Sequence, residues 1–433
     1  MRLCAHGWVA SRCDVDRPVT TRRDSPAPTS APTELESPYA WLRLAISLLI
    51  MTIGSVGMWS AVVVLPAIQA EFAATRADAS LPYTMSMVSF VVGQILMGRL
   101  ADRFGVFVPV VAGAVALALG YAGASAATSL WQFTAAYGLL IGFLGSSALF
   151  GPMIADTSHW FSRRRGLAVA ICSCGSYLAG TIWPPIVQHF TQTAGWRATH
   201  LGIGVFCAVT MLPLALVLRR RSPVTHGTTT SAARASARLP RSLSPNMLQA
   251  LLMVAGIACC VAMSMPQVHI VAYSGDLGHG TTHGAEMLSL MLGFGVVSRL
   301  ASGWLADRIG PLLTLILGSG GQALSLLLYL PFDGLVSLYV VSALFGLSQG
   351  GIVPSYALIV REHFPPAQAG TRITLVLSAT VAGMALGGWM SGAIFDLTES
   401  YQAAFVNGFV WNLLNMGIAL WLLRRLTWRV AYA

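Results

Sequence analysis

The sequence has 433 residues, of which 55% are hydrophobic and only 10% are charged, and its mean hydropathy is +0.68. A soluble domain carries about 25% charged residues, so this chain has too little polar material to cover a water-facing surface. All 26 basic residues are arginine, and the formal net charge is +10. The composition excludes a soluble globular protein and predicts an all-α polytopic membrane protein, because helices satisfy their own backbone groups in lipid.

The seven cysteines exclude two further classes of protein. Two of them fall in the polar N-terminal segment and five in apolar runs, so they form no disulfide framework, and no Cys/His cluster has zinc spacing. We therefore expect neither a metal nor another cofactor.

In chain order, residues 1–40 are polar, with no apolar run long enough for a signal peptide. We predict a disordered, dispensable cytoplasmic tail there. Uncharged stretches near or above the roughly 20 residues that cross a bilayer then follow. In the first half they are Leu44–Ala70, Ala79–Gly98, Gly105–Ala155, Gly166–Trp196 and Ala198–Leu218, of which the third is long enough for two helices with a break near Gly123–Leu130.

The second half repeats this organisation. Its apolar stretches are Ser242–Ser274, Met287–Ser298 extended through Arg299 to Leu305, Gly310–Phe332, Gly334–Val360, Ile373–Phe395 and Tyr401–Leu423. Twelve transmembrane helices result. We predict six-helix bundles at 41–220 and 244–425, a flexible cytoplasmic linker at 221–243 and a cytoplasmic tail at 426–433.

The arginines indicate the orientation. Of all 26, only Arg76 and Arg197 fall in loops on the face that lacks the termini, and Arg299 falls within a span. Because cytoplasmic loops carry the excess of basic residues, both termini are predicted to be cytoplasmic, in a bacterial inner membrane. The positive charge thus reflects topology, and nucleic acid is not an expected partner.

An internal repeat relates the two halves. At an offset of 205 residues, VVGQILMGRLADRFG (91–105) aligns with VVSRLASGWLADRIG (296–310), and eight of the fifteen positions are identical. Each copy lies between the second and third spans of its half. A duplicated six-helix unit in parallel orientation is a common plan for transporters.

The shared string G-x-L-A-D-R-x-G has a physical interpretation. The first glycine of each copy would allow a close helix approach, and the last would allow a tight turn. The aspartate could face a helix N-terminus or a loop arginine, and so lock one conformation. The predicted latch comprises Gly98, Asp102, Arg103, Gly105, Gly303, Asp307, Arg308 and Gly310, with Arg163, Arg164 and Arg165 as loop partners.

Twelve spans, a basic central loop and two copies of this motif closely resemble the major facilitator superfamily of secondary transporters. FSRRRGLAVAICSCGSYLAG (161–180) and the arginine of VVSRLASG further resemble the monocarboxylate and oxalate/formate group of that superfamily. The resemblance implies two pseudo-symmetric six-helix bundles, alternating access and a substrate-binding role for Arg299.

Arg299 lies eight residues before Asp307, about 12 Å deeper along a helix. An arginine at mid-membrane costs about 2.5–3.5 kcal/mol, so it should face a partner or a wet cavity, although snorkelling to the surface is an alternative. Its counterpart in the first half is Gln94. A guanidinium grips a carboxylate with two parallel hydrogen bonds, which favours a small organic anion as substrate.

The chain departs from the resembled group in its charged residues. Animal monocarboxylate carriers have a lysine on the first helix and an aspartate one turn before the arginine, where this chain has no lysine and Gly295. Protons remain a candidate coupling ion, but the proton-coupling residues of the resembled group have no counterpart in this chain. One fixed cation fits a monoanion better than a dianion, and we expect a monomer in the bilayer.

Other polar side chains within the spans are candidates to line a cavity, each with an interfacial or interhelical role as the alternative. His269 is the best of them for titration near neutral pH. The candidates are Trp59, Tyr83, Tyr137, Tyr177, Trp183, His269, Gln349, Tyr356 and Asn412.

Three rival functions remain to be weighed. A membrane enzyme would need a catalytic constellation, and GLSQG (346–350) matches a hydrolase nucleophile motif only in letters, because it lies in an apolar helix. A non-transporting sensor would usually append a signalling domain. A carrier of another solute or a drug exporter shares the fold. The absence of a P-loop excludes ATP-driven transport by this chain alone.

Overall fold

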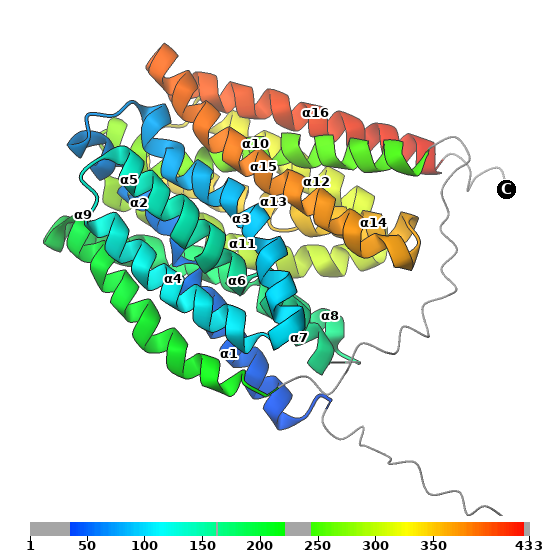
Figure 1. Cartoon of the computed structure of the whole chain (residues 1–433). Coiled ribbons are helices and arrows are strands. Elements are labelled where there is room, and N and C mark those ends of the chain that lie inside the picture. The colour runs from blue at the N-terminus through cyan, green and yellow to red at the C-terminus, as the bar shows by residue number, and fades with distance from the viewer. Residues whose placement is uncertain (1–34, 162, 221–243, 428–433) are drawn as a thin grey trace, which may run out of the picture.

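The computed structural model describes residues 35–161, 163–220 and 244–427. Within them the chain is helical throughout and contains no strand (Figure 1). The first half comprises α1 (Pro38–Gly54), α2 (Val56–Glu71), α3 (Arg76–Phe104), α4 (Phe107–Ser125), α5 (Leu130–Ala135), the π-helix η2 (Ala136–Ser146), α6 (Ser147–Leu149), α7 (Gly151–Trp160), α8 (Arg165–Ser173) and α9 (Gly175–Val217). The second half comprises α10 (Pro245–Asp276), α11 (Thr281–Ile309), α12 (Pro311–Leu328), α13 (Leu335–Gln349), α14 (Ile352–His363), α15 (Pro366–Thr398) and α16 (Tyr401–Thr427).

Eleven of the described helical segments are long and apolar enough to cross a membrane. One of them, Gly166–Val217, has 52 residues, about 78 Å of helix, and therefore holds two crossings. They meet at Gly195, whose φ of 82° interrupts the helix. The predicted boundary near residues 196–198 lies at this kink. The prediction of an all-α polytopic membrane protein is confirmed.

Several crossings consist of two helices in line. The break between α8 and α9 falls at Cys174, and the break between α13 and α14 falls at Gly350 and Gly351. Interrupted helices leave backbone carbonyls without their usual partners, and such carbonyls can bind polar groups inside a membrane protein. Both breaks lie beside Arg299, in the candidate site described below.

Two helix pairs carry most of the packing between the halves: α3 lies against α15, and α9 lies against α11. Figure 1 shows α3 and α15 side by side. We call the end where α1 begins and α16 ends the terminal end, which lies to the right in Figure 1, and the other the opposite end. The predicted linker at 221–243 and most of both predicted tails lie outside the described residues.

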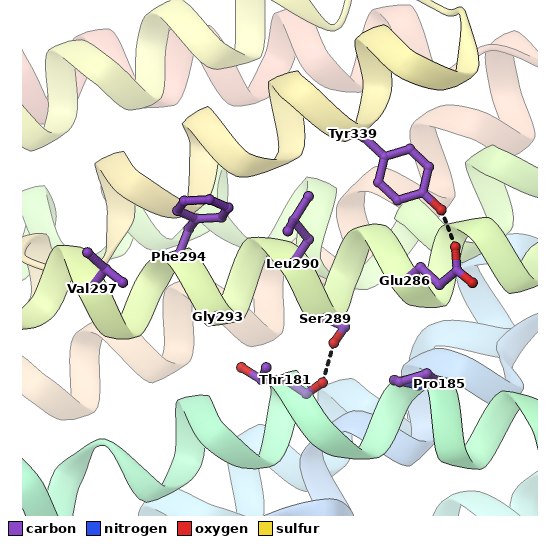
Figure 2. A pocket seen from close by; sticks show the side chains of 9 residues that line it. All are labelled: Thr181, Pro185, Glu286, Ser289, Leu290, Gly293, Phe294, Val297 and Tyr339. Atoms are coloured by element: carbon purple, nitrogen blue, oxygen red, sulfur yellow. Dashed lines mark hydrogen bonds between the residues drawn. The ribbon is translucent and has the colours of Figure 1, made fainter.

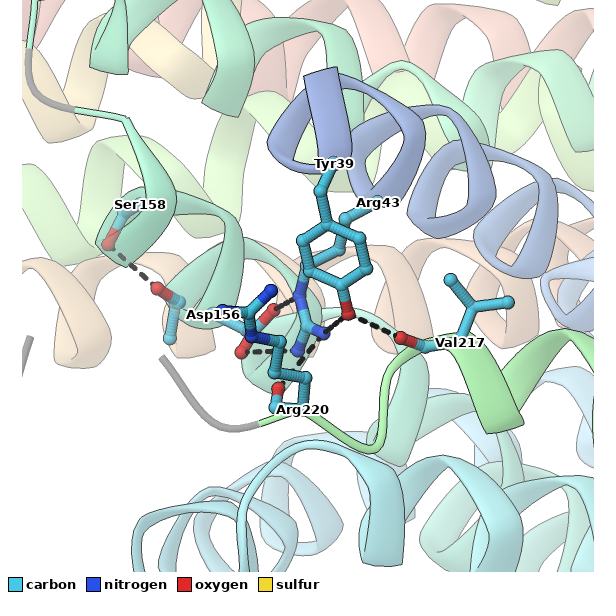
Figure 3. Close-up of polar contacts among 7 residues, drawn as sticks. Tyr39, Arg43, Asp156, Ser158, Val217 and Arg220 are labelled. Carbon is cyan, nitrogen blue, oxygen red and sulfur yellow. Dashed lines mark hydrogen bonds and ion pairs between the residues drawn. The ribbon is translucent and has the colours of Figure 1, made fainter. Parts of the chain in front are cut away.

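A buried ion pair holds the first half together at the terminal end (Figure 3). The Arg43 guanidinium on α1 donates to both carboxylate oxygens of Asp156 on α7, at 2.8 and 3.0 Å, and also to the carbonyl of Arg220 at 3.1 Å. The side chains of Arg43 and Asp156 are only 2% and 12% exposed. Buried charges of this kind persist only when they are paired.

Candidate functional site

Arg299 lies where the two halves meet, ten residues before the end of α11 and about 15 Å inside the helix. Its Nη1 donates to the carbonyl of Ser173 on α8 at 3.2 Å, and its Nε donates to the carbonyl of Gly350 at 3.4 Å. The guanidinium also lies over the ring of Tyr177, 4.3 Å from its centroid. These hydrogen bonds are long, and no carboxylate among the described residues pairs with Arg299. The half-buried positive charge is therefore not neutralised.

Two buried amides lie about one turn of α11 away from this cation, because Gln349 Nε2 is 3.8 Å from the position of a Cβ on Gly295. Gln267 on α10 donates from Nε2 to Oε1 of Gln349 at 2.5 Å, and Gln349 directly precedes Gly350. This arrangement leaves Gln349 Nε2 and Gln267 Oε1 buried with no partner among the described residues. A buried amide without a hydrogen bond costs about 1–3 kcal/mol, which makes the free N–H of Gln349 a donor available to a ligand.

Aromatic rings from the first half form one wall of the same region. Trp59 Nε1 donates to the carbonyl of Ser176 at 3.1 Å, and a Cβ on Gly180 would lie within about 3 Å of both the Trp59 ring and Leu292 of α11. The Tyr177 ring packs against Gly295, one turn before Arg299. Of the predicted candidates, Tyr177 contacts Arg299 directly, Gln349 lies near Gly295 one turn before it, and Trp59 contacts α9 at Ser176 and Gly180. Sequence reasoning missed Gln267, whose only signal was an amide within an apolar span.

Glycines allow α11 and α13 to approach closely here. A Cβ on Gly346 would lie 2.2 Å from the carbonyl of Met291, and one on Gly350 would lie 2.7 Å from the backbone nitrogen of Arg299. The GLSQG segment is therefore a packing motif on a helix, and it brings the Gly350 carbonyl to the guanidinium.

Gln94, the counterpart of Arg299, points into its own half. Its Oε1 is the nearest atom to Gly151 of α7, 3.1 Å from the position of an added Cβ. No contact with Arg299 is found among the described residues, so the expected facing pair of guanidinium and amide is not formed in this structure.

Tyr83 and His269 lie on either side of one glycine, toward the opposite end. Gly388 on α15 separates them: its Cβ position lies 3.2 Å from the Tyr83 ring, and His269 Nε2 lies 2.8 Å from its carbonyl. The Nδ1 of His269 lies 3.2 Å from the hydroxyl of Tyr401. With both ring nitrogens engaged and no exposed surface, His269 is held in the second half.

The remaining candidates make their hydrogen bonds within a single half. Tyr137 hydrogen-bonds Ser60 at 2.9 Å and His200 at 2.7 Å, all inside the first half. Tyr356 donates to Asn415 at 2.7 Å, and Asn412 donates to the carbonyl of Ser319 at 2.7 Å, inside the second. Trp183 donates to the carbonyl of Thr52 at 2.9 Å. None of these groups contacts Arg299.

The repeated motif sits at the terminal end of α3 and α11. Gly105 and Gly310 have φ of 82° and 88°, the left-handed region that the predicted turn requires. Close packing at the first glycine of each copy is not seen, because a Cβ on Gly98 or Gly303 would meet no atom within 4 Å.

The charges of the motif are exposed. The side chains of Asp102, Arg103, Asp307 and Arg308 make no hydrogen bond or ion pair among the described residues, and the two arginines lie over neighbouring aromatic rings. The predicted latch contacts are therefore not formed in this conformation.

The loop arginines bind elsewhere. The backbone N–H groups of Arg163 and Arg164 donate to one carboxylate oxygen of Glu36 at 2.6 and 2.9 Å, which anchors this loop beside the start of α1. Neither contacts the motif aspartates, and the side chain of Arg165 lies outside what the structure describes.

A set of contacts that sequence reasoning missed joins the halves at the opposite end. Arg76, at the start of α3, donates to both carboxylate oxygens of Asp276 on α10 at 3.0 and 2.9 Å. The backbone N–H groups of Arg76 and Ala77 donate to the two carboxylate oxygens of Asp396 on α15, both at 2.8 Å. The carboxylate of Asp396 thus caps a helix of the other half. We call Arg76, Asp276 and Asp396 the seal.

Further hydrogen bonds between the halves also lie toward the opposite end. Gln188 donates to Thr281 at 2.7 Å and Gln192 donates to Thr282 at 2.8 Å, each linking α9 to the start of α11. No group of three or more His, Cys, Asp or Glu side chains that could hold a metal ion is found in the described part of the chain.

Comparisons with known proteins agree with this architecture. The sequence matches the Major Facilitator Superfamily over residues 47–371 and 287–429. It is 29% identical to monocarboxylate transporter 13 of Bos taurus over 75% of this chain and 76% of the relative. It is 25% identical to the uncharacterized MFS-type transporter YcxA of Bacillus subtilis, over 76% of this chain and 82% of that protein.

Solved transporter structures share the fold. The nucleoside transporter NupG (D323A mutant) superposes with a TM-score of 0.68 at 14% identity, over 87% of this chain and 99% of that one. A bacterial homologue of the human lysosomal transporter Spinster gives 0.69 at 13% identity, over 90% and 97%. The chain therefore belongs to the Major Facilitator Superfamily and is a multi-pass membrane transporter of that type.

Proposed function

We propose that this protein is a secondary active transporter that moves a small organic anion, preferably a monocarboxylate, by alternating access, and that Arg299 binds the carboxylate. The observation that carries the proposal is the half-buried guanidinium at the boundary of the halves, held only by two long bonds to carbonyls. The unpartnered Nε2 of Gln349 beside it supplies a second donor. The names of the bovine and rat relatives, both monocarboxylate transporters, support the substrate class.

The arrangement accounts for selectivity by charge. One carboxylate oxygen would accept from Arg299 and the other from Gln349, which satisfies the buried amide as well as the cation. The half-buried Tyr177 ring offers apolar surface to the remainder of the substrate, whereas Trp59 and Leu292 are buried beside Gly180. A single cation with neutral neighbours suits one negative charge better than two.

Substrate binding would also act on the contact between the halves. The Ser173 carbonyl belongs to the first half and Arg299 to the second. A carboxylate is a stronger acceptor than a carbonyl, so it would bind Nη2, which makes no hydrogen bond among the described residues, and compete with Ser173 for Nη1. Anion binding would thereby weaken one of the contacts that hold α8 against α11.

We propose further that the terminal end faces the cytoplasm of a bacterial inner membrane, with both termini on that side. The arginine distribution supports this orientation. With the seal formed and the motif charges exposed, the described conformation then corresponds to an inward-facing state. A reporter fused to the C-terminus should be active only on the cytoplasmic side, and activity in the periplasm would reverse the assignment.

The test of the anion site is counterflow in proteoliposomes with a panel of mono- and dicarboxylates, with and without a pH gradient. Arg299→Gln, which installs the residue of the first half, should weaken monocarboxylate binding about 10- to 100-fold, since a hydrogen bond to a charged group contributes about 1.5–3 kcal/mol. Arg361→Gln removes an equal charge at an exposed position of α14, outside the predicted latch, and is the matched control.

Other outcomes would redirect the proposal. Carboxylate uptake that survives Arg299→Gln at the wild-type affinity removes the anchor role. Counterflow of uncharged solutes or drugs in place of carboxylates would assign the chain to another substrate class of the superfamily, and no counterflow of any kind would favour a sensor. A dependence on the pH gradient would identify protons as the coupling ion.

A further inference from the structure

A groove of about 490 Å³ lies between α9, α11 and α13, away from Arg299 (Figure 2). Thr181 of α9 forms one wall and Tyr339 of α13 the other, while Glu286, Leu290, Phe294 and Val297 follow one another along α11. Figure 2 shows these side chains of α11 lying between the other two helices.

The groove opens toward the bilayer. On α11 the buried positions 284, 288, 291, 295 and 298 recur at helical spacing and face the protein interior. Leu290 precedes Arg299 by nine residues, about two and a half turns, so the two lie on opposite faces of the helix. Val297 in the groove is 55% exposed. Because α11 crosses the membrane, this exposed face meets lipid rather than water.

A carboxylate marks the opposite-end limit of the groove. The hydroxyl of Tyr339 donates to Glu286 Oε2, and Nδ1 of His283 lies 3.2 Å from the same oxygen. The Glu286 side chain remains 44% exposed. It lies five residues into α11, about 7.5 Å from the helix start, which is the level of the lipid headgroups for a helix of 29 residues.

The remaining lining runs from this level into the hydrocarbon. Leu290, Phe294 and Val297 lie about 6, 12 and 16 Å deeper than Glu286 along the helix. The groove therefore presents a negative, hydrogen-bonding end at the headgroup level and an apolar track at the level of the acyl chains. No arginine lines it among the described residues.

We infer that the groove is a binding site for a phospholipid with a primary ammonium headgroup, whose ammonium binds the Glu286 carboxylate and whose acyl chain lies along Leu290, Phe294 and Val297. An ammonium supplies three N–H donors and a fixed positive charge to a carboxylate whose partners in the protein are the Tyr339 hydroxyl and the His283 imidazole. An anionic headgroup would meet Glu286 without a compensating arginine. Since its walls come from both halves, a bound lipid holds α9 against α11.

The experiment is native mass spectrometry of the full-length protein released from nanodiscs that contain equal amounts of phosphatidylethanolamine and phosphatidylglycerol. We expect preferential retention of phosphatidylethanolamine, and a loss of about 10-fold in that preference for Glu286→Gln. Glu362→Gln, which changes an exposed carboxylate on α14 in the same way, is the matched control and should retain the lipid. The readout does not depend on which solute is carried.

A second variant separates lipid loss from misfolding. Leu290→Trp fills the apolar track without changing charge, so it should also reduce lipid retention while the protein elutes as a single monodisperse species. Equal retention of the two lipids by the wild type would overturn the inference. So would Glu286→Gln protein that keeps its preference for phosphatidylethanolamine, because the carboxylate would then not bind the headgroup.

Discussion

The seal at the opposite end should set the balance between conformations. Asp276→Asn keeps the size of the side chain but removes its charge, and so breaks the ion pair between α3 of the first half and α10 of the second. Because these helices must separate when the opposite end opens, the pair stabilises only the state in which that end is closed. Its loss should shift the population toward the other state.

The magnitude follows from the exposure of the pair. A hydrogen bond between charged groups contributes about 1.5–3 kcal/mol, and Asp276 is 39% exposed while Arg76 is 7% exposed, so solvent screens part of this energy. We expect about 1–2 kcal/mol, which corresponds to a change of about 5- to 30-fold in the ratio of the two conformations.

The assay is a distance measurement by double electron–electron resonance between spin labels at Phe104 and Ile309. These residues are the last of α3 and α11 at the terminal end, occupy equivalent positions in the repeat, and are 44% and 37% exposed. Cys4 and Cys13 would be replaced by serine, since the five other cysteines are buried. In Asp276→Asn a population with a shorter distance should appear as the terminal end closes.

Glu71→Gln is the matched control for this measurement. Glu71 pairs with Arg197 at the opposite end, as Asp276 does with Arg76, but Glu71 and Arg197 both belong to the first half. Breaking this pair should leave the distance distribution unchanged. If Asp276→Asn gave the wild-type distribution, or if Glu71→Gln shifted it as much, the pair between the halves would not control the conformational balance.

Three further predictions concern the fold and the repeated motif. Arg43→Met should lower the free energy of unfolding by about 3–5 kcal/mol, because it leaves Asp156 buried without its partner; thermal unfolding in detergent measures the loss. The double variant Arg43→Met with Asp156→Leu should recover part of this loss, and no recovery would refute the pairing argument. Gly310→Ala should lower the free energy of unfolding by about 1–3 kcal/mol, because the φ of Gly310 is 88°. Gly303→Ala, at an open helical position, should not destabilise the protein, and equal losses for the two variants would contradict the conformational argument. Asp102→Asn should slow turnover in counterflow more than it weakens substrate binding, and an unchanged rate would count against the latch.

The helices and their turns could be predicted from sequence because the signals are local. Uninterrupted apolar runs of sufficient length define the crossings, and Gly105 and Gly310 occupy turns that exclude a side chain. The position of Arg299 within a span was likewise visible, because a charge among apolar residues is conspicuous in any window of the sequence.

The surroundings of Arg299 could not be predicted in the same way. Nearly every face of these helices is apolar, so the helical period does not show which polar residue points toward the centre. Tyr137, Tyr356 and Asn412 turn into their own halves, whereas Gln349 lies near Gly295, one turn before Arg299, and binds Gln267. Asp276, the partner of Arg76, lies 200 residues away in the sequence, and no local pattern indicates such a pair.

The difference between the two halves is the reason for placing the proposed anion site on α11 and not on α3. Gln94 is neutral and packs against Gly151, so the first half needs no ligand at this position. Arg299 occupies the equivalent place but carries a charge that two carbonyls at 3.2 and 3.4 Å only partly compensate. One of those carbonyls comes from the first half, so under the proposed function a bound anion would complete the neutralisation and compete with a contact between the halves. With that contact weakened, the seal at Arg76 shares the closure of the opposite end with the hydrogen bonds of Gln188 and Gln192, and we expect Asp276→Asn to affect the conformational balance most strongly when substrate is bound.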